Sequence, residues 1–93
     1  MAVLSSDQIE ERLRSCSGWS LDGLAILREF TFPDFARAMT FVNRIATAAE
    51  EANHHPDFDI RYTKVVLRLS SHDAGGLTSR DFNLAHRINL IEP

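Results

Sequence analysis

Residues Pro33–Pro56, PDFARAMTFVNRIATAAEEANHHP, predict one long amphipathic helix whose apolar face forms the core, and the rest of the fold is arranged around this helix. Apolar residues recur along it at the i, i+3, i+4 and i+7 spacing of a single helical face. Pro33 and Asp34 suit the helix start, where backbone N–H groups lack partners. Pro56 predicts an end near Asn53. The predicted core face consists of Phe35, Ala38, Met39, Val42, Ile45, Ala46 and Ala49.

A β-hairpin is predicted on each side of this helix. Asp22-Gly23 is a strong two-residue turn signal for the first hairpin. In the second, Phe58, Ile60 and Tyr62 alternate with charged residues, which predicts a half-buried strand. Residues 63–64 are the expected turn. The predicted strands cover residues 19–21, 24–32, 57–62 and 65–70.

Shorter helices are predicted near both ends of the chain. Ser5 and Gln8 have the spacing of a capping box, and so do Thr78 and Asp81. Leu77 and Phe82 fit the hydrophobic staple around the second of these boxes. The last helix should bury an apolar face made of Leu84, Ala85, Ile88 and Ile91.

The resulting order, α-β-β-α-β-β-α, predicts an α+β fold. In this fold a four-stranded antiparallel sheet has helices packed on one face. We expect a single domain spanning residues 1–93. The other face of the sheet must be solvated, paired with another subunit or used for a ligand. Self-association is expected because so short a chain buries only a modest core.

The charge and the cysteine content of the chain exclude or disfavour several classes of function. A net charge of −3 and a pI of about 5.7 argue against direct nucleic-acid binding, though not against contact with a DNA-binding protein. Cys16 is the only cysteine, so an intramolecular disulfide and a multi-thiolate zinc site are excluded. Cys16 is expected to be a small buried hydrophobe. No signal peptide or membrane-spanning run is visible, so we expect a cytoplasmic protein that does not bind membranes.

Three of the four histidines, His54, His55 and His72, fall within nineteen positions. Histidine takes and gives protons near neutral pH, so the cluster suggests acid–base chemistry on a small molecule. Pairing the third and fourth strands brings the start of one beside the end of the other, and hence these histidines together. Glu50 lies four residues before His54 and would share its helical face if the helix persists that far.

Other chemistries fit the pattern less well. Adjacent His54 and His55 point in divergent directions, which disfavours a shared metal ion. Ser70 and Ser71 precede His72, but neighbours on an extended chain face apart, which disfavours a serine nucleophile. Some candidates also suit structural roles, which the sequence leaves open: Glu50 as a solvated charge, Trp19 as core, Asp81 as a helix cap and His86 as a surface residue.

The full pattern resembles the signature of the pterin-4a-carbinolamine dehydratases, also known as the dimerisation cofactor of a homeodomain transcription factor. It reads Glu50-x3-His54-His55-Pro56, five residues to Tyr62, nine to His72 and eight to Asp81. The resemblance extends from about residue 13 to residue 91, and the fold of this family is the one predicted above. Further matching segments are Gly18-Trp19, residues 30–35, Ser71-His72, residues 76–78 and residues 81–85.

The resemblance implies a hydro-lyase. The enzyme would remove water from a 4a-hydroxytetrahydropterin such as 4a-hydroxytetrahydrobiopterin to give the quinonoid dihydropterin. That step recycles tetrahydrobiopterin for aromatic amino acid hydroxylases. It needs a proton delivered to the leaving hydroxyl and one removed from N5, both general acid–base tasks. The implied reaction needs no metal, nucleophile or redox cofactor.

The resemblance also implies residue roles and partners. His54 and His72 would be the acid–base residues, although which is acid and which is base stays open. His55 would orient the pterin and contribute to catalysis. The implied substrate-binding residues are Glu50 at the pterin edge, Trp19 lining the pocket, and Asp81 bonded to His72 or its loop.

Family members form dimers or tetramers, so a homodimer or homotetramer is expected, in the tetramer through paired helices. An aromatic amino acid hydroxylase or a regulator is a possible protein partner. The alternative function is a protein-binding module of the transcriptional coactivator type, with or without enzymatic activity. A third reading is an assembly factor of the same fold without pterin chemistry, but such relatives tend to lose the histidines that this chain keeps.

Overall fold

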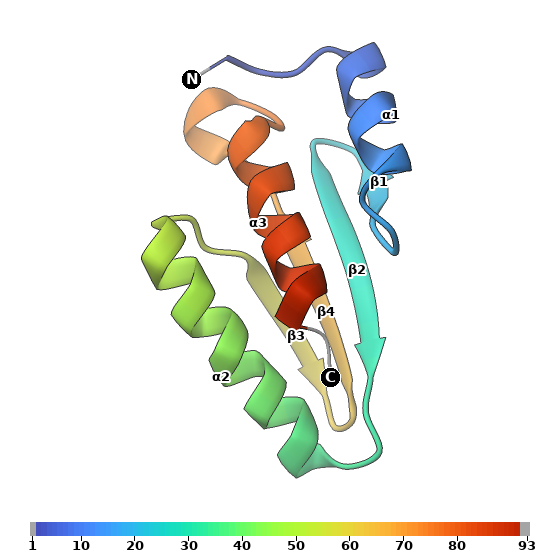
Figure 1. Cartoon of the computed structure of the whole chain (residues 1–93), viewed down its shortest axis with the longest axis vertical. Coiled ribbons are helices and arrows are strands. Elements are labelled where there is room, and N and C mark those ends of the chain that lie inside the picture. Colours follow the sequence, from blue (N-terminus) through green and yellow to red (C-terminus); the bar gives the residue numbers. More distant parts are fainter. Residues whose placement is uncertain (1, 92–93) are drawn as a thin grey trace.

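The chain folds into a four-stranded antiparallel sheet with helices packed on one of its faces (Figure 1). The structure is a computed structural model that describes residues 2–91. The predicted α-β-β-α-β-β-α order is confirmed, with one additional 3-10 turn, η1. The elements are α1 Ser6–Arg14, β1 Ser20–Asp22, β2 Ala25–Thr31, α2 Phe35–Ala52, β3 Asp57–Arg61, β4 Lys64–Leu69, η1 His72–Ala74 and α3 Ser79–Ile91.

Helix α2 forms as predicted, but the face it buries is rotated from the predicted one. Phe35 is 49% exposed and Ala46 is exposed, whereas Phe41 is buried. The Phe41 ring lies 4.7 Å from the ring of Phe30 in β2 and 5.1 Å from the ring of Phe32, which follows that strand. Apolar residues occupy a wide arc of this helix, and contact with the sheet selects which side is buried. The buried face consists of Ala38, Phe41, Ile45, Ala48 and Ala49.

The strand order is β1-β2-β4-β3, with every neighbouring pair antiparallel. Both predicted hairpins form, but each turn differs from its prediction by one residue. Asp22 pairs with Ala25, so the first loop lies one residue later than Asp22-Gly23. The second loop lies at residues 62–63, one residue before the predicted 63–64, and Tyr62 has a positive φ of 55° there.

Strand β3 is an edge strand, and its predicted half-burial is wrong. All five of its residues are exposed, because the helices do not cover this edge of the sheet. Phe58 and Ile60 are 36% and 38% exposed. The helix-free face of the sheet carries ion pairs between strands, Lys64–Glu29 and Arg68–Asp22, so charged groups dominate this face.

The end helices carry the predicted caps. Both hydrogen bonds of the Ser5–Gln8 capping box are present at α1. At α3, the Asp81 carboxylate accepts from the Thr78 N–H at 2.9 Å, and Leu77 is buried with the rest of the staple. Leu84, Ala85 and Ile88 are buried as predicted, and Cys16 is fully buried. Within residues 2–91, no helix combines the length and apolarity needed to span a bilayer.

Candidate active site

A single left-handed residue at the end of α2 separates the two adjacent histidines. Asn53 has φ 50° and ψ 42°, a conformation that asparagine tolerates better than most residues. The His54 N–H donates back to the Ala49 carbonyl at 3.1 Å, which holds His54 against the helix end. His54 is 8% exposed, whereas His55 is exposed. The expectation that the two side chains diverge is therefore confirmed.

His54 forms a buried pair with Asp81 at the start of α3. His54 Nε2 lies 2.6 Å from Asp81 Oδ1. The second carboxylate oxygen accepts from the Ser71 hydroxyl and from the Thr78 N–H, both at 2.9 Å. Asp81 is fully buried, in the first turn of α3, where the helix dipole favours a negative charge. Both oxygens of this buried carboxylate have hydrogen-bond partners, so Asp81 can hold the His54 imidazole in a fixed position.

Asp81 contacts a different histidine from the one that sequence similarity implies. The implied partner was His72 or its loop, but within residues 2–91 the Asp81 carboxylate makes no hydrogen bond to His72 and reaches that region only at Ser71, which directly precedes His72. Its imidazole partner is His54. The reason is the packing of the helices: the end of α2 lies against the start of α3, so His54 lies next to Asp81.

Glu50 does not share a site with His54. Helix α2 ends at Ala52, so the helical i, i+4 relation between residues 50 and 54 is lost. The Glu50 carboxylate instead contacts His55 Nε2, and both side chains are exposed. The carboxylate orients the His55 ring at the protein surface. The sequence predicts a shared face for Glu50 and His54 only if the helix persists to residue 54, and that condition is not met.

His72 lies at the same end of the sheet but faces another direction. It begins η1, which Gly75 closes in the left-handed conformation with φ 81°. The His72 side chain is exposed and makes no hydrogen bond or ion pair to another residue in the range 2–91. It lines a cavity of about 290 Å³ together with Leu24, Ala25, Arg68, Ser70, Gly75 and Gly76.

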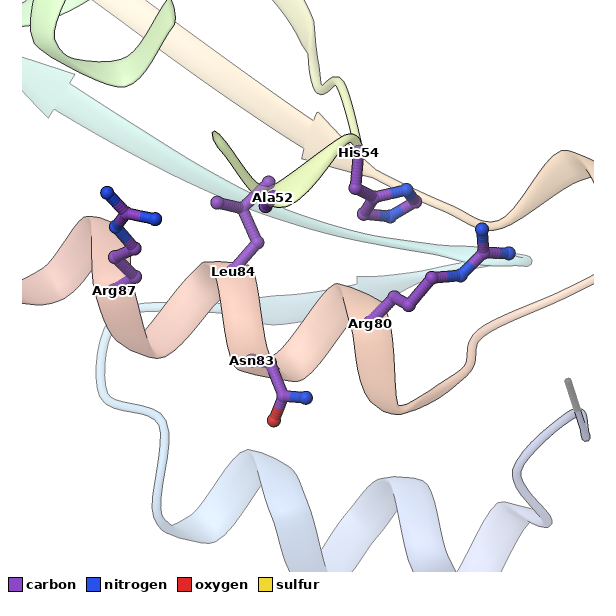
Figure 2. A pocket seen from close by; sticks show the side chains of 6 residues that line it. All are labelled: Ala52, His54, Arg80, Asn83, Leu84 and Arg87. Atoms are coloured by element: carbon purple, nitrogen blue, oxygen red, sulfur yellow. The ribbon is translucent and has the colours of Figure 1, made fainter. Parts of the chain in front are cut away.

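A second cavity, of about 270 Å³, opens beside His54 (Figure 2). It lies between the end of α2 and one side of α3, and two arginines from α3 flank it. Arg80 pairs with Asp73 at 2.7 Å, and Arg87 pairs with Glu51 of α2. The lining residues are Ala52, His54, Arg80, Asn83, Leu84 and Arg87.

Arg80 was not anticipated from the sequence. Its guanidinium ties η1 to α3, and hydrogen bonding from Arg80 lowers the pKa of the Asp73 carboxyl below its ordinary value. Its Nε is buried and has no partner within residues 2–91. The only local sequence signal was an arginine next to a capping aspartate, and that placement alone does not indicate a site.

Trp19 is part of the core. It is 6% exposed, and its indole N–H donates to Asn89 of α3 at 2.9 Å. Asn89 in turn donates to the Ser17 carbonyl at 3.0 Å. Trp19 lines neither of the two cavities described above. This geometry favours the structural role that the sequence left open beside a ligand role.

The three histidines therefore present three different states at one end of the sheet. His54 is buried and bound to a carboxylate, His55 is exposed and bound to Glu50, and His72 is exposed without a side-chain partner in the described range. Within residues 2–91, no three histidine, cysteine, aspartate or glutamate side chains gather as metal ligands. Imidazoles in different environments suit proton transfer in both directions.

The chain is similar in sequence to known proteins of one family. The profile of the family described as pterin 4 alpha carbinolamine dehydratase matches residues 2–91. A protein of Koribacter versatilis, provisionally named pterin-4-alpha-carbinolamine dehydratase, is 49% identical over 98% of this chain and 97% of its own length. A protein of Acidobacterium capsulatum with the same provisional name is 54% identical over 98% of this chain and 99% of its own.

Solved structures share the fold. A transcriptional coactivator/pterin dehydratase from Brucella melitensis superposes with a TM-score of 0.92 at 35% identity, covering 98% of this chain and 99% of that one. A pterin dehydratase-like protein, described as a RuBisCO assembly factor in the α-carboxysome, has a TM-score of 0.64 at 20% identity. It covers 78% of this chain and 84% of its own, and it shows likeness of fold alone.

Proposed function

This chain belongs to the pterin 4 alpha carbinolamine dehydratase family, and from that premise we propose that it is a hydro-lyase acting on a 4a-hydroxytetrahydropterin. The proposed product is the quinonoid dihydropterin. The proposed role is recycling of tetrahydrobiopterin for aromatic amino acid hydroxylases. A cytoplasmic location is part of this proposal and rests on the sequence expectation.

The chemistry requires two proton movements and no change in oxidation state. The C4a–oxygen bond breaks as a proton reaches the leaving hydroxyl, and the N5–H proton is taken up as the C4a–N5 double bond forms. In this proposal His54 and His72 exchange these protons, and each general acid–base step contributes about 10²–10⁴-fold. His55, oriented by Glu50, contacts the pterin ring.

The observation that carries the proposal is the buried His54–Asp81 pair. A mostly buried histidine that is held by a fully hydrogen-bonded carboxylate has a defined orientation before any substrate binds. Such preorganisation is expected of an acid–base group and is not needed in a surface histidine. His72, at the same end of the sheet, supplies an exposed imidazole.

Stopped-flow ultraviolet absorbance of freshly generated 4a-hydroxytetrahydrobiopterin tests the function. We expect the wild type to accelerate loss of the carbinolamine in the presence of a chelator. His54→Ala and His72→Ala should each lower the rate by about 10²-fold or more. His86→Ala is the matched control, because His86 is an exposed histidine of α3 outside both cavities. A folded wild type without acceleration would reject the dehydratase.

The proposal includes a homodimer or homotetramer. The helix-free face of the sheet carries ion pairs and is a poor hydrophobic interface. The exposed edge of β3 is better suited, because Phe58 and Ile60 lie there beside backbone groups that no strand within residues 2–91 pairs.

A second candidate is a protein-binding module of the coactivator type, since the name of the Brucella melitensis relative includes that role. The partner would be an aromatic amino acid hydroxylase or a transcriptional regulator. Loss of turnover in His54→Ala with unchanged partner binding would separate the two functions.

A further inference from the structure

The buried hydroxyl groups of Ser71 and Thr78 extend the hydrogen bonding of the His54–Asp81 pair, on the side of Asp81 away from His54. Ser71 directly precedes η1 and Thr78 directly precedes α3, and the oxygen atoms of their hydroxyl groups lie 2.9 Å apart. Ser71 is 1% exposed and Thr78 is fully buried. The Ser71 hydroxyl also donates to Asp81 Oδ2 at 2.9 Å. The four side chains form one continuous hydrogen-bonded row from Thr78 to His54.

The direction of each hydrogen bond follows from counting protons. Ser71 has one hydroxyl hydrogen, which it donates to Asp81, so the Thr78 hydroxyl must donate to Ser71. Asp81 Oδ2 receives a second hydrogen from the Thr78 backbone N–H. With Oδ2 satisfied by two donors, Oδ1 is left to accept from His54 Nε2.

We infer that Ser71 and Thr78 are positioning residues that fix the tautomer of His54, with Nε2 protonated toward Asp81 and Nδ1 left to exchange the proton with substrate. Within residues 2–91, Nδ1 has no hydrogen-bond partner, and it is not among the side-chain atoms sealed from solvent without one. His54 lines the cavity beside α3. The substrate part of this inference rests on the proposed dehydratase activity, whereas the tautomer does not.

The same geometry predicts what an amide in place of the carboxylate would do. In Asp81→Asn, the two donors at Oδ2 hold the amide oxygen in that position and turn its NH2 group toward His54. Nε2 must then accept a hydrogen bond, so the ring proton moves to Nδ1. The imidazole keeps its place and loses its free acceptor nitrogen, as happens when the orienting aspartate of a catalytic triad becomes asparagine.

Long-range 1H–15N correlation spectra of the histidine rings test this directly on the whole chain. We expect neutral His54 to carry its proton on Nε2 in the wild type and on Nδ1 in Asp81→Asn. Asp59→Asn is the matched control, because Asp59 lies on exposed β3, and it should leave the His54 spectrum unchanged. A wild type protonated on Nδ1 overturns the inference even if Asp81→Asn fails to fold.

Measurements of kcat distinguish a positioning role of Thr78 from a purely structural one. Thr78→Val removes the hydroxyl at constant shape and should lower kcat about tenfold, the effect of one hydrogen bond, with KM little changed. Thr78→Ser keeps the hydroxyl and should retain most of the activity. Thr47→Val, on the exposed side of α2, is the control for the substitution itself. Equal kcat values in Thr78→Val and Thr78→Ser would overturn the positioning role.

The two proposals fail in distinguishable ways. If the wild type shows no turnover but His54 has the expected tautomer and inverts in Asp81→Asn, the dehydratase proposal fails and the hydrogen-bonded row stands. If turnover is present but Asp81→Asn leaves the proton on Nε2, the row does not set the tautomer and the further inference fails alone.

Discussion

At the scale of single residues, closeness in the sequence does not indicate that two side chains point the same way. His54 and His55 are neighbours, yet one is buried on Asp81 and the other lies at the surface on Glu50. The cause is Asn53, whose left-handed backbone ends α2 and changes the direction of the chain just before the two histidines. Glu50 illustrates the same point, because its apparent helical partner His54 lies beyond the helix end.

The Asp73–Arg80 pair makes a residue-scale prediction about pH. Arg80 lowers the pKa of Asp73 from its ordinary 3.8, so the folded state favours the charged carboxylate. The resulting stabilisation is present above the unfolded pKa and is lost as pH falls through the lower folded pKa. We therefore expect Asp73→Asn to be less stable than wild type at pH 7, with the difference shrinking below about pH 3.8.

Urea unfolding of both proteins at pH 7 and pH 3 measures this difference. The control is Asp57→Asn, an exposed aspartate with no ion pair to a residue in the described range. A gap between wild type and Asp73→Asn that persists unchanged at pH 3 would contradict the electrostatic explanation.

At the scale of secondary-structure elements, capping residues decide where helices begin. Asp34 accepts from the Arg37 N–H at 2.8 Å and opens α2, which carries five buried residues. Ser5 opens α1 with a complete capping box, but α1 has no fully buried residue. The two caps are chemically similar and differ in how strongly their helices are joined to the core.

Replacing each cap by alanine should reveal that difference. Asp34→Ala should lower the free energy of unfolding by about 1 kcal/mol, the usual effect of losing an N-cap. Ser5→Ala should lower it less, because α1 can fray at its start without opening the core. Chemical denaturation monitored by circular dichroism gives both values, and an equal loss in the two variants would contradict this ranking of the helices.

At the scale of the whole molecule, the exposed apolar residues of β3 suggest how copies of the chain associate. An uncovered edge strand offers both hydrogen-bonding groups and apolar side chains to a second copy. Edge β1 is also uncovered, but its three residues make it too short to pair extensively. The proposed assembly therefore uses the β3 edge, with closed symmetry.

Sedimentation velocity at micromolar concentration checks this assembly. We expect the wild type to sediment as a dimer or tetramer of the 10.5 kDa chain and Ile60→Lys to shift toward the monomer. Leu24→Lys is the matched control, because Leu24 is 68% exposed in the loop between β1 and β2, at the opposite side of the sheet from β3. A wild type found only as a 10.5 kDa species would reject the oligomer.

The order of helices and strands, the two hairpins, the caps at Ser5 and Asp81 and the histidines of the candidate site could all be predicted from the amino-acid sequence. These features depend on local periodicity, turn chemistry and capping, which act over a few neighbouring residues. Family resemblance added the proposed reaction and its residue roles.

The hydrogen-bond partner of each site residue depends instead on how distant segments pack together. Asp81 binds His54, Ser71 and the Thr78 N–H because β4 and the ends of α2 and α3 meet there, and no local pattern encodes that meeting. The same holds for the buried side of α2, which contact with Phe30 selects from a wider apolar arc. Exposure of β3 likewise follows from its place at the edge of the sheet, since strand order is set by packing between distant segments.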